Sequence, residues 1–324
     1  MAATKGKTQF KGVFMLLLTA FVWGTSFVAQ SVGMERIDAF TFNGIRTLMG
    51  AAALLPFLLT RDLLSAKKHN RGPGERAAFR AEKRKLIVPG ICMGLALCAA
   101  GNVQQFAFKY TTPGKIAFIT AFYMFFVPVL GIFIGKRIRW VTWCCVFMGV
   151  VGLYFLCVTG EGFSAVNRGD LLSLACSVLF AVHILVIEHF SGFEDSIALS
   201  FIQFTTSGLV TICLMFIFEK PDLKEINAAI LPLLYSGVMS CGFAYTFQVV
   251  GQKYTESTVA SILMCMESVF GVLSSAVLLR QMLTGREIAG CVIMFAAIII
   301  SQFSDRIADG LKRKTDSPKQ QNTA

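Results

Sequence analysis

The stretch TVASILMCMESVFGVLSSAVLL, from Thr258 to Leu279, is apolar enough to lie in lipid, yet it carries one carboxylate, Glu267, near its centre. A helix needs about 20 apolar residues to cross a bilayer, and this stretch has that length. An ionised group at mid-bilayer costs roughly 2.5–3.5 kcal/mol on insertion scales, so such residues usually face the interior of a helix bundle. Glu267 is therefore expected either to serve a functional site or to be neutralised by a neighbour.

The whole chain shares this apolar character. Of its 324 residues, 55% are hydrophobic and only 15% are charged, 30 are Phe, and the mean hydropathy is +0.65. An average globular domain is far more polar, so the composition predicts an all-α polytopic membrane protein. Ten stretches are expected as transmembrane helices, over residues 11–32, 39–60, 86–107, 114–135, 141–158, 170–190, 197–218, 229–251, 258–279 and 286–304.

The basic residues predict the orientation of these spans. The longest connection, residues 61–85, carries nine Lys or Arg and is cytoplasmic under the positive-inside rule. Threading ten spans from it places 21 of the 30 basic residues in the cytoplasm and eight outside, with Arg46 inside a span. Both termini are then cytoplasmic and the protein lies in the cell membrane. The net charge of +11 marks topology and contact with lipid headgroups, so no nucleic-acid partner is expected.

The first span and the cysteines favour a retained membrane helix and buried thiols. The apolar run that begins at residue 11 is longer than that of a secretory signal, and no A-x-A site closes it. Nearly all of the ten cysteines fall inside spans and none forms a CxxC motif. We expect neither a disulfide framework, nor a metal site, nor a cofactor.

An internal repeat relates the two halves of the chain. At an offset of 157, GVFMLLLTAFVWGTSF from Gly12 aligns with GDLLSLACSVLFAVHI from Gly169. Past the basic connection the offset falls to 144, and QQFAFKYTTPGKIAF from Gln104 aligns with QVVGQKYTESTVASI from Gln248. Two copies of a five-span unit must insert with opposite orientation, which predicts an inverted repeat.

Three segments resemble a known family. LLTAFVWGTSFVAQ in span 1, YTTPGKIAFITAFYMFFVPVLGIFIGKRI in span 4 and YTESTVASILMCMESVFGVLSSAVLLRQMLTGREIAGCVIMFAAIIIS in spans 9 and 10 are similar to the two EamA domains of the drug/metabolite transporter superfamily. The resemblance covers about residues 10–303. It implies ten helices as two inverted five-helix repeats around a central cavity, without ATP hydrolysis. Members of the family mostly export small metabolites, amino acids among them.

The chain departs from the family pattern at two loops and inside span 9. The family often has a Glu after the fourth and ninth spans, where this chain has Lys136 and Gln281, so ion pairs between the halves that depend on those glutamates are in doubt. The common Glu-Pro of span 9 is here Glu267 followed by Ser268. The expected organisation is a cytoplasmic N-terminus (1–10), a first repeat (11–158), a second repeat (169–304) and a basic cytoplasmic tail (305–324).

Polar and aromatic side chains within the spans are candidates to line the cavity. Hydroxyl and amide groups beside aromatic faces suit an amphipathic organic solute. For Trp23 and Ser26, helix packing and a backbone hydrogen bond are equally acceptable roles, and His183 is more often a packing residue than a proton relay. The candidates are Trp23, Ser26, Gln30, Asn43, Arg46, Gln104, Tyr123, His183, Gln203, Tyr245, Gln248, Met264 and Glu267.

The two charged candidates suggest specific roles. Arg46 aligns with neutral Gln203, and it either contacts an acidic group of the substrate or pairs internally with Glu267. Glu267 shares a helix face with Met264, and it either couples transport to protons, or faces a substrate amine, or only packs.

Small residues at helical spacing raise the question of a dimer. Gly90 with Gly94, and Gly131 with Gly135, permit close helix approach. Packing within one bundle is the simpler interpretation, and a homodimer seam on span 4 is the alternative.

The leading function is secondary transport of a small organic metabolite, with amino acids and related solutes among the candidate substrates, by alternating access across the plasma membrane; the family resemblance implies export. A membrane enzyme is disfavoured because the chain has no HExxH and no paired-aspartate motif. A channel or receptor is the remaining alternative.

Overall fold

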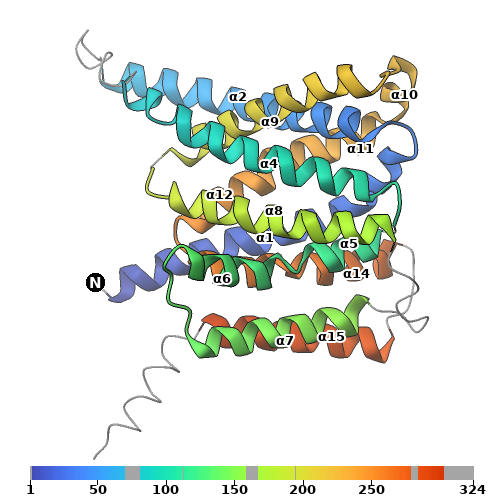
Figure 1. Cartoon of the computed structure of the whole chain (residues 1–324). Helices are drawn as coiled ribbons and strands as arrows, with labels where there is room; N and C mark the ends of the chain where they lie inside the picture. The colour runs from blue at the N-terminus through green and yellow to red at the C-terminus, as the bar shows by residue number, and fades with distance from the viewer. Residues whose placement is uncertain are drawn as a thin grey trace, which may run out of the picture.

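The structure is a computed structural model that describes residues 2–69, 81–111, 113–157, 167–193, 195–278 and 284–302. Every regular element in this part of the chain is a helix (Figure 1). The helices are α1 (Ala2–Met34), α2 (Ala39–His69), α4 (Ile87–Ala107), α5 (Pro113–Thr120), α6 (Tyr123–Phe133), α7 (Trp140–Cys157), α8 (Arg168–His189), α9 (Ser196–Phe218), α10 (Leu223–Ala228), α11 (Ile230–Leu234), the π-helical η1 (Tyr235–Tyr245), α12 (Thr246–Gln252), α13 (Ser257–Met264), α14 (Met266–Leu278) and α15 (Gly285–Gln302).

The bundle has the length and surface of a polytopic membrane protein. Seven helical stretches in the described residues are long and apolar enough to cross a membrane. Three shorter apolar stretches, Trp140–Phe155, Ser257–Gly271 and Ile288–Ser301, fall where spans 5, 9 and 10 were expected. Large apolar side chains such as Phe133 (82% exposed), Phe147 and Phe216 point outward, as a lipid environment favours. Gln281, which replaces the family glutamate after span 9, lies outside the described residues, as do the last residues of span 10 and the basic tail.

Helix packing is symmetric under exchange of the two halves of the chain. In sequence order, α1, α2, α4, α5–α6 and α7 correspond to α8, α9, α11–η1–α12, α13–α14 and α15. Helix α2 packs on its counterpart α9, and α7 on its counterpart α15. Helix α1 packs on α14 as α8 packs on α5 and α6, and α1 packs on η1 and α12 as α8 packs on α4. In Figure 1, α1 runs from left to right and α8 from right to left.

Matching residues of the two halves make matching contacts. A Cβ added to Gly12 would meet Thr255, and a Cβ added to Gly169 would meet Thr111. Gly12 and Gly169 are 157 positions apart, and Thr111 and Thr255 are 144 apart, the two offsets found in the sequence. The sequence repeat is therefore also a repeat of the packing.

Two buried hydrogen bonds repeat in the same way. The Thr19 hydroxyl donates to the Ala244 carbonyl oxygen at 2.9 Å, and the Cys176 thiol donates to the Ala100 carbonyl oxygen at 3.5 Å. Thr19 and Cys176 are related by the offset of 157, and Ala100 and Ala244 by the offset of 144. Each bond ties the first helix of one half to the third span of the other.

Spans 4 and 9 are both interrupted near their middles. Helix α5 ends at Thr120 and α6 begins at Tyr123, while α13 ends at Met264 and α14 begins at Met266. At the first break the backbone tightens, because the Phe122 amide donates to the oxygen of Ile119, three residues back. Neither break contains Pro or Gly, so turn-forming residues do not cause it.

The counterpart helices α2 and α9 are tied at both ends by charge. Asp195 caps the start of α9 through the Ala198 amide at 3.0 Å and accepts two hydrogen bonds from Arg61 of α2, at 2.6 and 2.7 Å. At the other end, Glu219 follows α9 and accepts from the backbone amides of Phe40 and Thr41, at 2.9 and 2.7 Å. Both carboxylates lie at a helix N-terminus, where a negative charge is stabilising.

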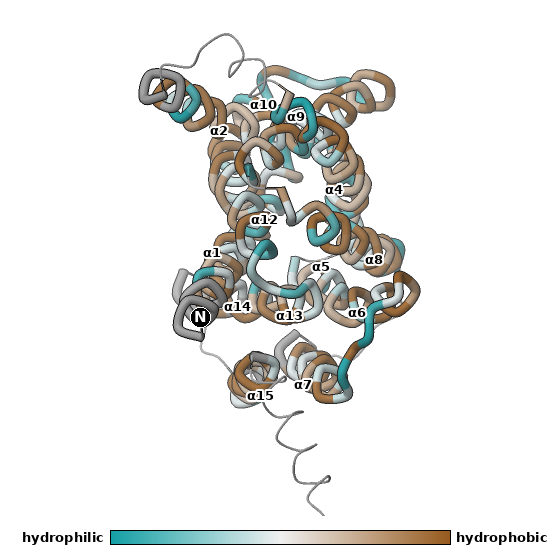
Figure 2. Tube along the Cα trace, turned by 90° about the vertical axis from the view of Figure 1, so that its left-hand side faces the viewer, coloured by the Kyte–Doolittle hydropathy of each residue, from teal (hydrophilic) through white to brown (hydrophobic). Residues whose placement is uncertain are grey.

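Helices α7 and α15 pack together at one end of the bundle (Figures 1 and 2). They contact the remainder mainly through α13, α14 and α5. In the end-on view of Figure 2 the hydrophilic segment between α6 and α7 leads to this pair, and the other helices surround the middle of the molecule. The middle is where the candidate site lies.

The paired glycines of span 3 lie against α9. A Cβ on Gly90 would meet Ile202, and one on Gly94 would lie 2.7 Å from the Gln203 carbonyl oxygen. A Cβ on Gly131 would meet only Lys136 of the following loop, and Gly135 has a φ of +83° with nothing nearby. The Gly90–Gly94 pair thus packs within one bundle, and the dimer seam on span 4 stays a prediction.

Gly94→Ala should destabilise the protein, because the new methyl group meets a backbone oxygen of α9 that cannot move alone. We expect a loss of about 1–3 kcal/mol, measured as a lower midpoint of thermal unfolding in detergent. Gly114→Ala is the matched control, since a Cβ at Gly114 would meet nothing within 4 Å. Equal midpoints for the two variants would contradict the close crossing of α4 and α9.

Candidate functional site

The middle of the bundle contains a narrow space of about 20 Å³, room for about one water molecule. Its walls come from both halves of the chain and combine aromatic, amide and charged side chains. The lining residues are Trp23, Phe27 and Gln30 of α1, Arg46 of α2, Gln104 of α4, Thr120 of α5, Tyr123 of α6, Phe180 and Ile184 of α8, Ser240 and Tyr245 of η1, Gln248 of α12 and Glu267 of α14. We call this space the central cavity.

Most of the residues singled out in the sequence line the central cavity. Those in its wall are Trp23, Gln30, Arg46, Gln104, Tyr123, Tyr245, Gln248 and Glu267. Five others, Ser26, Asn43, His183, Gln203 and Met264, are buried but do not line it. Two of these five lie directly behind lining residues: Ser26 accepts a hydrogen bond from Gln30 at 3.4 Å, and Asn43 accepts one from Arg46.

His183 and Gln203 bond to each other rather than to the central cavity. The His183 Nε2 and Gln203 Oε1 atoms are 3.2 Å apart, and both side chains are fully buried. The imidazole packs beside Phe180 and Tyr245, with ring centroids 6.5 and 6.1 Å away. This pair supports the cavity wall from behind.

Four lining residues were not singled out in the sequence: Phe27, Phe180, Ile184 and Ser240. The repeat could have found one of them, because Phe180 lies 157 positions after the candidate Trp23. Apolar residues in an apolar span otherwise carry no signal that separates a cavity wall from a lipid-facing or packed position.

Arg46 presents its guanidinium to the central cavity with few partners. Its Nε donates to the Asn43 side-chain oxygen at 2.9 Å, and its guanidinium carbon lies 5.7 Å from the centroid of the Phe42 ring. The side chain is almost fully buried. Within the described residues Arg46 forms no ion pair, and its two terminal nitrogens make no hydrogen bond. Those nitrogens can bind a carboxylate at two points.

Glu267 also lines the central cavity without a cationic partner. The Tyr123 hydroxyl donates to its Oε1 at 3.2 Å, and the residue is almost fully buried. Its second oxygen has no hydrogen-bond partner among the described residues. The expected alternative of an internal ion pair between Arg46 and Glu267 is therefore wrong for this structure. Instead, one cavity contains an unpaired guanidinium and an unpaired carboxyl group.

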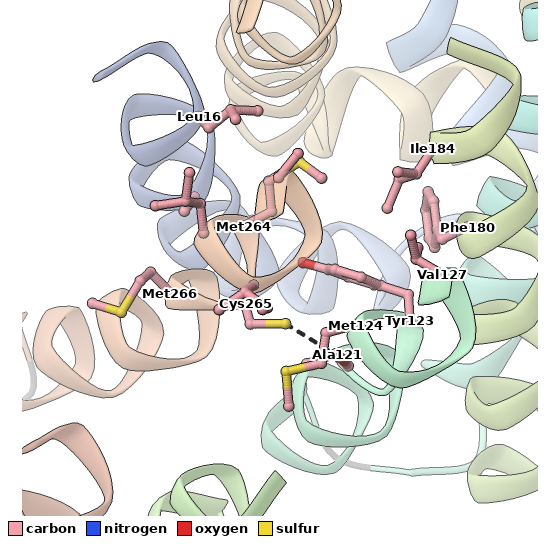
Figure 3. Close-up of a cluster of buried hydrophobic side chains, with 14 of the residues drawn as sticks. Leu16, Ala121, Tyr123, Met124, Val127, Phe180, Ile184, Met264, Cys265 and Met266 are labelled. Carbon is pink, nitrogen blue, oxygen red and sulfur yellow. Dashed lines mark hydrogen bonds between the residues drawn. The ribbon is translucent and has the colours of Figure 1, made fainter. Parts of the chain in front are cut away.

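The breaks in spans 4 and 9 position this carboxyl group. Tyr123 and Glu267 are 144 positions apart and are repeat counterparts, each just after the break of its span. Figure 3 shows the two breaks against each other, with the Cys265 thiol bonded to the Ala121 carbonyl oxygen at 3.3 Å. The same view shows the Tyr123 hydroxyl pointing toward Met264 and Cys265. Non-helical backbone at membrane depth is typical of sites between transporter repeats.

Several polar atoms around the central cavity lack partners. Trp23 Nε1, Gln30 Oε1 and Gln248 Oε1 are buried and make no hydrogen bond in the described part of the chain. The Trp23 ring packs on Tyr245, with centroids 4.6 Å apart. Because buried polar groups are nearly always hydrogen-bonded, these atoms indicate a cavity that holds water or a polar solute. Aromatic walls with a few polar groups suit a small amphipathic molecule.

Lys136, one of the two departures from the family pattern, forms a bond between the halves. Its ammonium group pairs with Glu188 at the end of α8 and donates to the Ser257 hydroxyl at 3.1 Å. The Ser257 amide in turn donates to Glu188 at 3.3 Å. The loop after span 4 is thus still tied to the second half, with the basic group on the loop and the acidic group on α8.

Known proteins resemble this chain over nearly its whole length. An uncharacterized transporter of Archaeoglobus fulgidus is 27% identical over 289 residues, 88% of this chain and 83% of the relative. The uncharacterized transporter YoaV of Bacillus subtilis is 22% identical over 298 residues, 89% of this chain and 96% of the relative.

A solved structure, titled only as a crystal structure of a protein, shares the fold. It superposes with a TM-score of 0.71 at 17% identity and covers 94% of this chain and 99% of its own. The pattern of the EamA-like transporter family matches residues 10–158 and 167–303, which confirms the resemblance seen in the sequence and favours a transporter over an enzyme. The chain belongs to the EamA-like transporter family.

Proposed function

We propose that this protein is a secondary transporter for a small zwitterionic organic solute, such as an amino acid with an apolar side chain. The observation that carries the proposal is the presence of unpaired Arg46 and Glu267 in one buried cavity. A buried charge without a partner is costly, and a solute that brings both opposite charges offsets two such costs at once. The carboxylate would bind Arg46 and the ammonium group would bind Glu267.

Once the two halves move apart to admit a solute, the residues that line the central cavity would suit the remainder of such a molecule. Trp23, Phe27 and Phe180 provide apolar faces, while the unpartnered atoms of Gln30 and Gln248 can accept hydrogen bonds. An ammonium group has three donors, so acceptors in addition to Glu267 are of use to it. A purely apolar solute would leave these acceptors unsatisfied.

We propose alternating access as the mechanism, with ten transmembrane helices arranged as two inverted repeats. The exchange symmetry of the packing and the opposite directions of α1 and α8 support inversion. A cavity between inverted repeats opens to one side or the other when the halves exchange conformations. The distribution of Lys and Arg supports cytoplasmic termini and a plasma-membrane location. Export is proposed from the family resemblance alone.

The decisive experiment is transport by purified protein in sealed liposomes. A panel of the twenty L-amino acids, with sugars and nucleosides as other metabolite classes, is tested for saturable flux down a gradient. Protein-dependent flux of at least one amino acid supports the proposal. Ion currents without solute flux, or specific binding without flux, would instead indicate a channel or a receptor.

Arg46→Gln should weaken binding of the transported amino acid without weakening binding of its carboxamide. Hydrogen bonds to charged groups contribute about 1.5–3 kcal/mol, so we expect a loss of roughly ten- to a hundredfold for the acid. Calorimetric titration of both compounds measures the difference. Arg36→Gln is the matched control, because Arg36 is exposed and, among the residues that the structure describes, pairs with Glu225 alone. Unchanged affinity for the acid in a folded Arg46→Gln protein would remove the carboxylate contact.

Glu267→Gln distinguishes the roles left for the carboxyl group. If Glu267 faces the substrate amine, the variant binds the amino acid more weakly but still binds its deaminated analogue. If Glu267 couples transport to protons, the variant loses proton-driven accumulation at every external pH while downhill exchange continues. Glu256→Gln, at the exposed start of span 9, is the control. Transport by Glu267→Gln at the wild-type rate and pH profile would leave the residue a packing role only.

Reaction of introduced cysteines with a small water-soluble thiosulfonate tests the position of the central cavity. Ser236 and Ser240 lie one turn apart on η1 and both are buried, but only Ser240 lines the cavity. In a background without the native cysteines, Ser240→Cys should react and Ser236→Cys should not. The transported amino acid should slow the reaction at Ser240→Cys. Equal rates at the two positions would contradict a water-accessible cavity at this depth.

A further inference from the structure

The guanidinium of Arg46 lies at the end of a chain of buried hydrogen bonds that leaves the central cavity. Arg46 Nε donates to Asn43 Oδ1 at 2.9 Å, and Asn43 Nδ2 donates to Asn102 Oδ1 at 2.7 Å. Asn102 Nδ2 then donates to the Thr211 hydroxyl at 3.0 Å. Four side chains from α2, α4 and α9 are linked in this way.

The donors and acceptors in this chain of hydrogen bonds can be arranged in only one way. A guanidinium has no acceptor, so Asn43 must turn its oxygen toward Arg46 and its amino group toward Asn102. Asn102 must then turn its oxygen toward Asn43 and its amino group toward Thr211, which accepts. The positive charge of Arg46 therefore fixes the orientation of both amides, and each amide in turn restricts the rotation of the guanidinium about its side chain.

The packing around the chain holds it in place. Asn43, Asn102 and Thr211 are 2%, 7% and 0% exposed. A Cβ on Gly101 would lie 3.3 Å from the Asn43 amide nitrogen, so the glycine allows α4 to approach this side chain closely. Cys98 fills the remaining space beside Asn102 and Thr211, at sulfur distances of 3.3 and 3.4 Å.

None of the three supporting residues lines the central cavity. Their hydrogen bonds reach the cavity wall through Arg46. Thr211 belongs to the second half of the chain, whereas Arg46, Asn43 and Asn102 belong to the first. The orientation of Arg46, the cationic group that the described residues place in the cavity wall, thus depends on contact between the two halves.

We propose that Asn43, Asn102 and Thr211 are positioning residues that hold Arg46 in the orientation that binds the substrate carboxylate, and so determine the preference for an acid over its neutral amide. This inference rests on the proposed function, because it assumes that Arg46 contacts a carboxylate. The chain leaves both terminal nitrogens of Arg46 free for a two-point contact. Without the chain, the guanidinium would rotate among several side-chain conformations, and fewer molecules would present that geometry.

Thr211→Val tests the proposal with little change in shape, because it removes the terminal hydroxyl and keeps the volume. The probes are L-leucine and L-phenylalanine, each compared with its own carboxamide by calorimetric titration of the full-length protein. We expect Thr211→Val and Asn102→Leu to bind the acids roughly tenfold more weakly and the amides unchanged. Thr211→Ser, which keeps a hydroxyl, should retain the wild-type preference for the acid over its amide. Thr205→Val is the matched control on α9, since the Thr205 hydroxyl bonds the Phe201 carbonyl of its own helix and no other group in the described part of the chain.

A double-mutant cycle separates positioning from stability. If the chain acts through Arg46, adding Thr211→Val to Arg46→Gln should cause no further loss of affinity for the acids. Equal weakening of acid and amide, or a full second loss in the double variant, would overturn the proposal.

A wild-type protein that prefers neither acid over its amide would overturn the carboxylate contact itself. A wild-type preference that survives both Thr211→Val and Asn102→Leu would overturn only the hydrogen-bonded chain. Should Asn102→Leu fail to fold, Thr211→Val alone decides.

Discussion

A backbone carbonyl or amide surrounded by lipid has no water to bond, so it must find its partner inside the protein. This constraint explains why the described chain is helical throughout its regular elements and why departures from the helix are confined to the interior. The breaks of spans 4 and 9 meet at mid-bundle, where the Ala121 carbonyl accepts hydrogen bonds from both the Met124 amide and the Cys265 thiol. Tyr123 and Glu267, which follow these two interruptions, both line the central cavity.

The sequence predicts the class of fold well because hydropathy and charge report directly on the bilayer. Long apolar runs and the distribution of Lys and Arg reflect which residues lie in lipid and which in water. That preference depends on each residue itself and not on its contacts with distant parts of the chain. The repeat offsets could be read for a related reason, since Gly12 and Gly169 occupy equivalent close contacts. The breaks at Ala121–Phe122 and Cys265, and the π-helical segment η1, were not predicted because none of these segments contains a proline. Their cause is tertiary.

The site was predictable to the extent that polarity in an apolar span marks a residue that avoids lipid. That signal correctly indicates burial for His183 and Gln203, but it cannot say that they bond each other instead of lining the cavity. It also cannot decide whether Arg46 and Glu267 meet, because they lie on helices whose separation is set by packing. Phe180 shows the opposite limit, since only its alignment with Trp23 distinguishes it from any other apolar residue. Equivalent positions in the two halves share a backbone environment while their side chains differ in chemistry.

Helices α2 and α9, and helices α7 and α15, are each packed on their own repeat counterpart. An interface between equivalent surfaces is isologous: the same patch serves on both sides, related by a two-fold axis. A single five-helix half would therefore present surfaces that are complementary to themselves, and two identical copies inserted in opposite directions could assemble as an antiparallel homodimer of this shape. Gene duplication and fusion of such a unit would yield a chain like this one. Fusion would then allow the halves to diverge, so that a guanidinium could remain in one copy where the other has an amide.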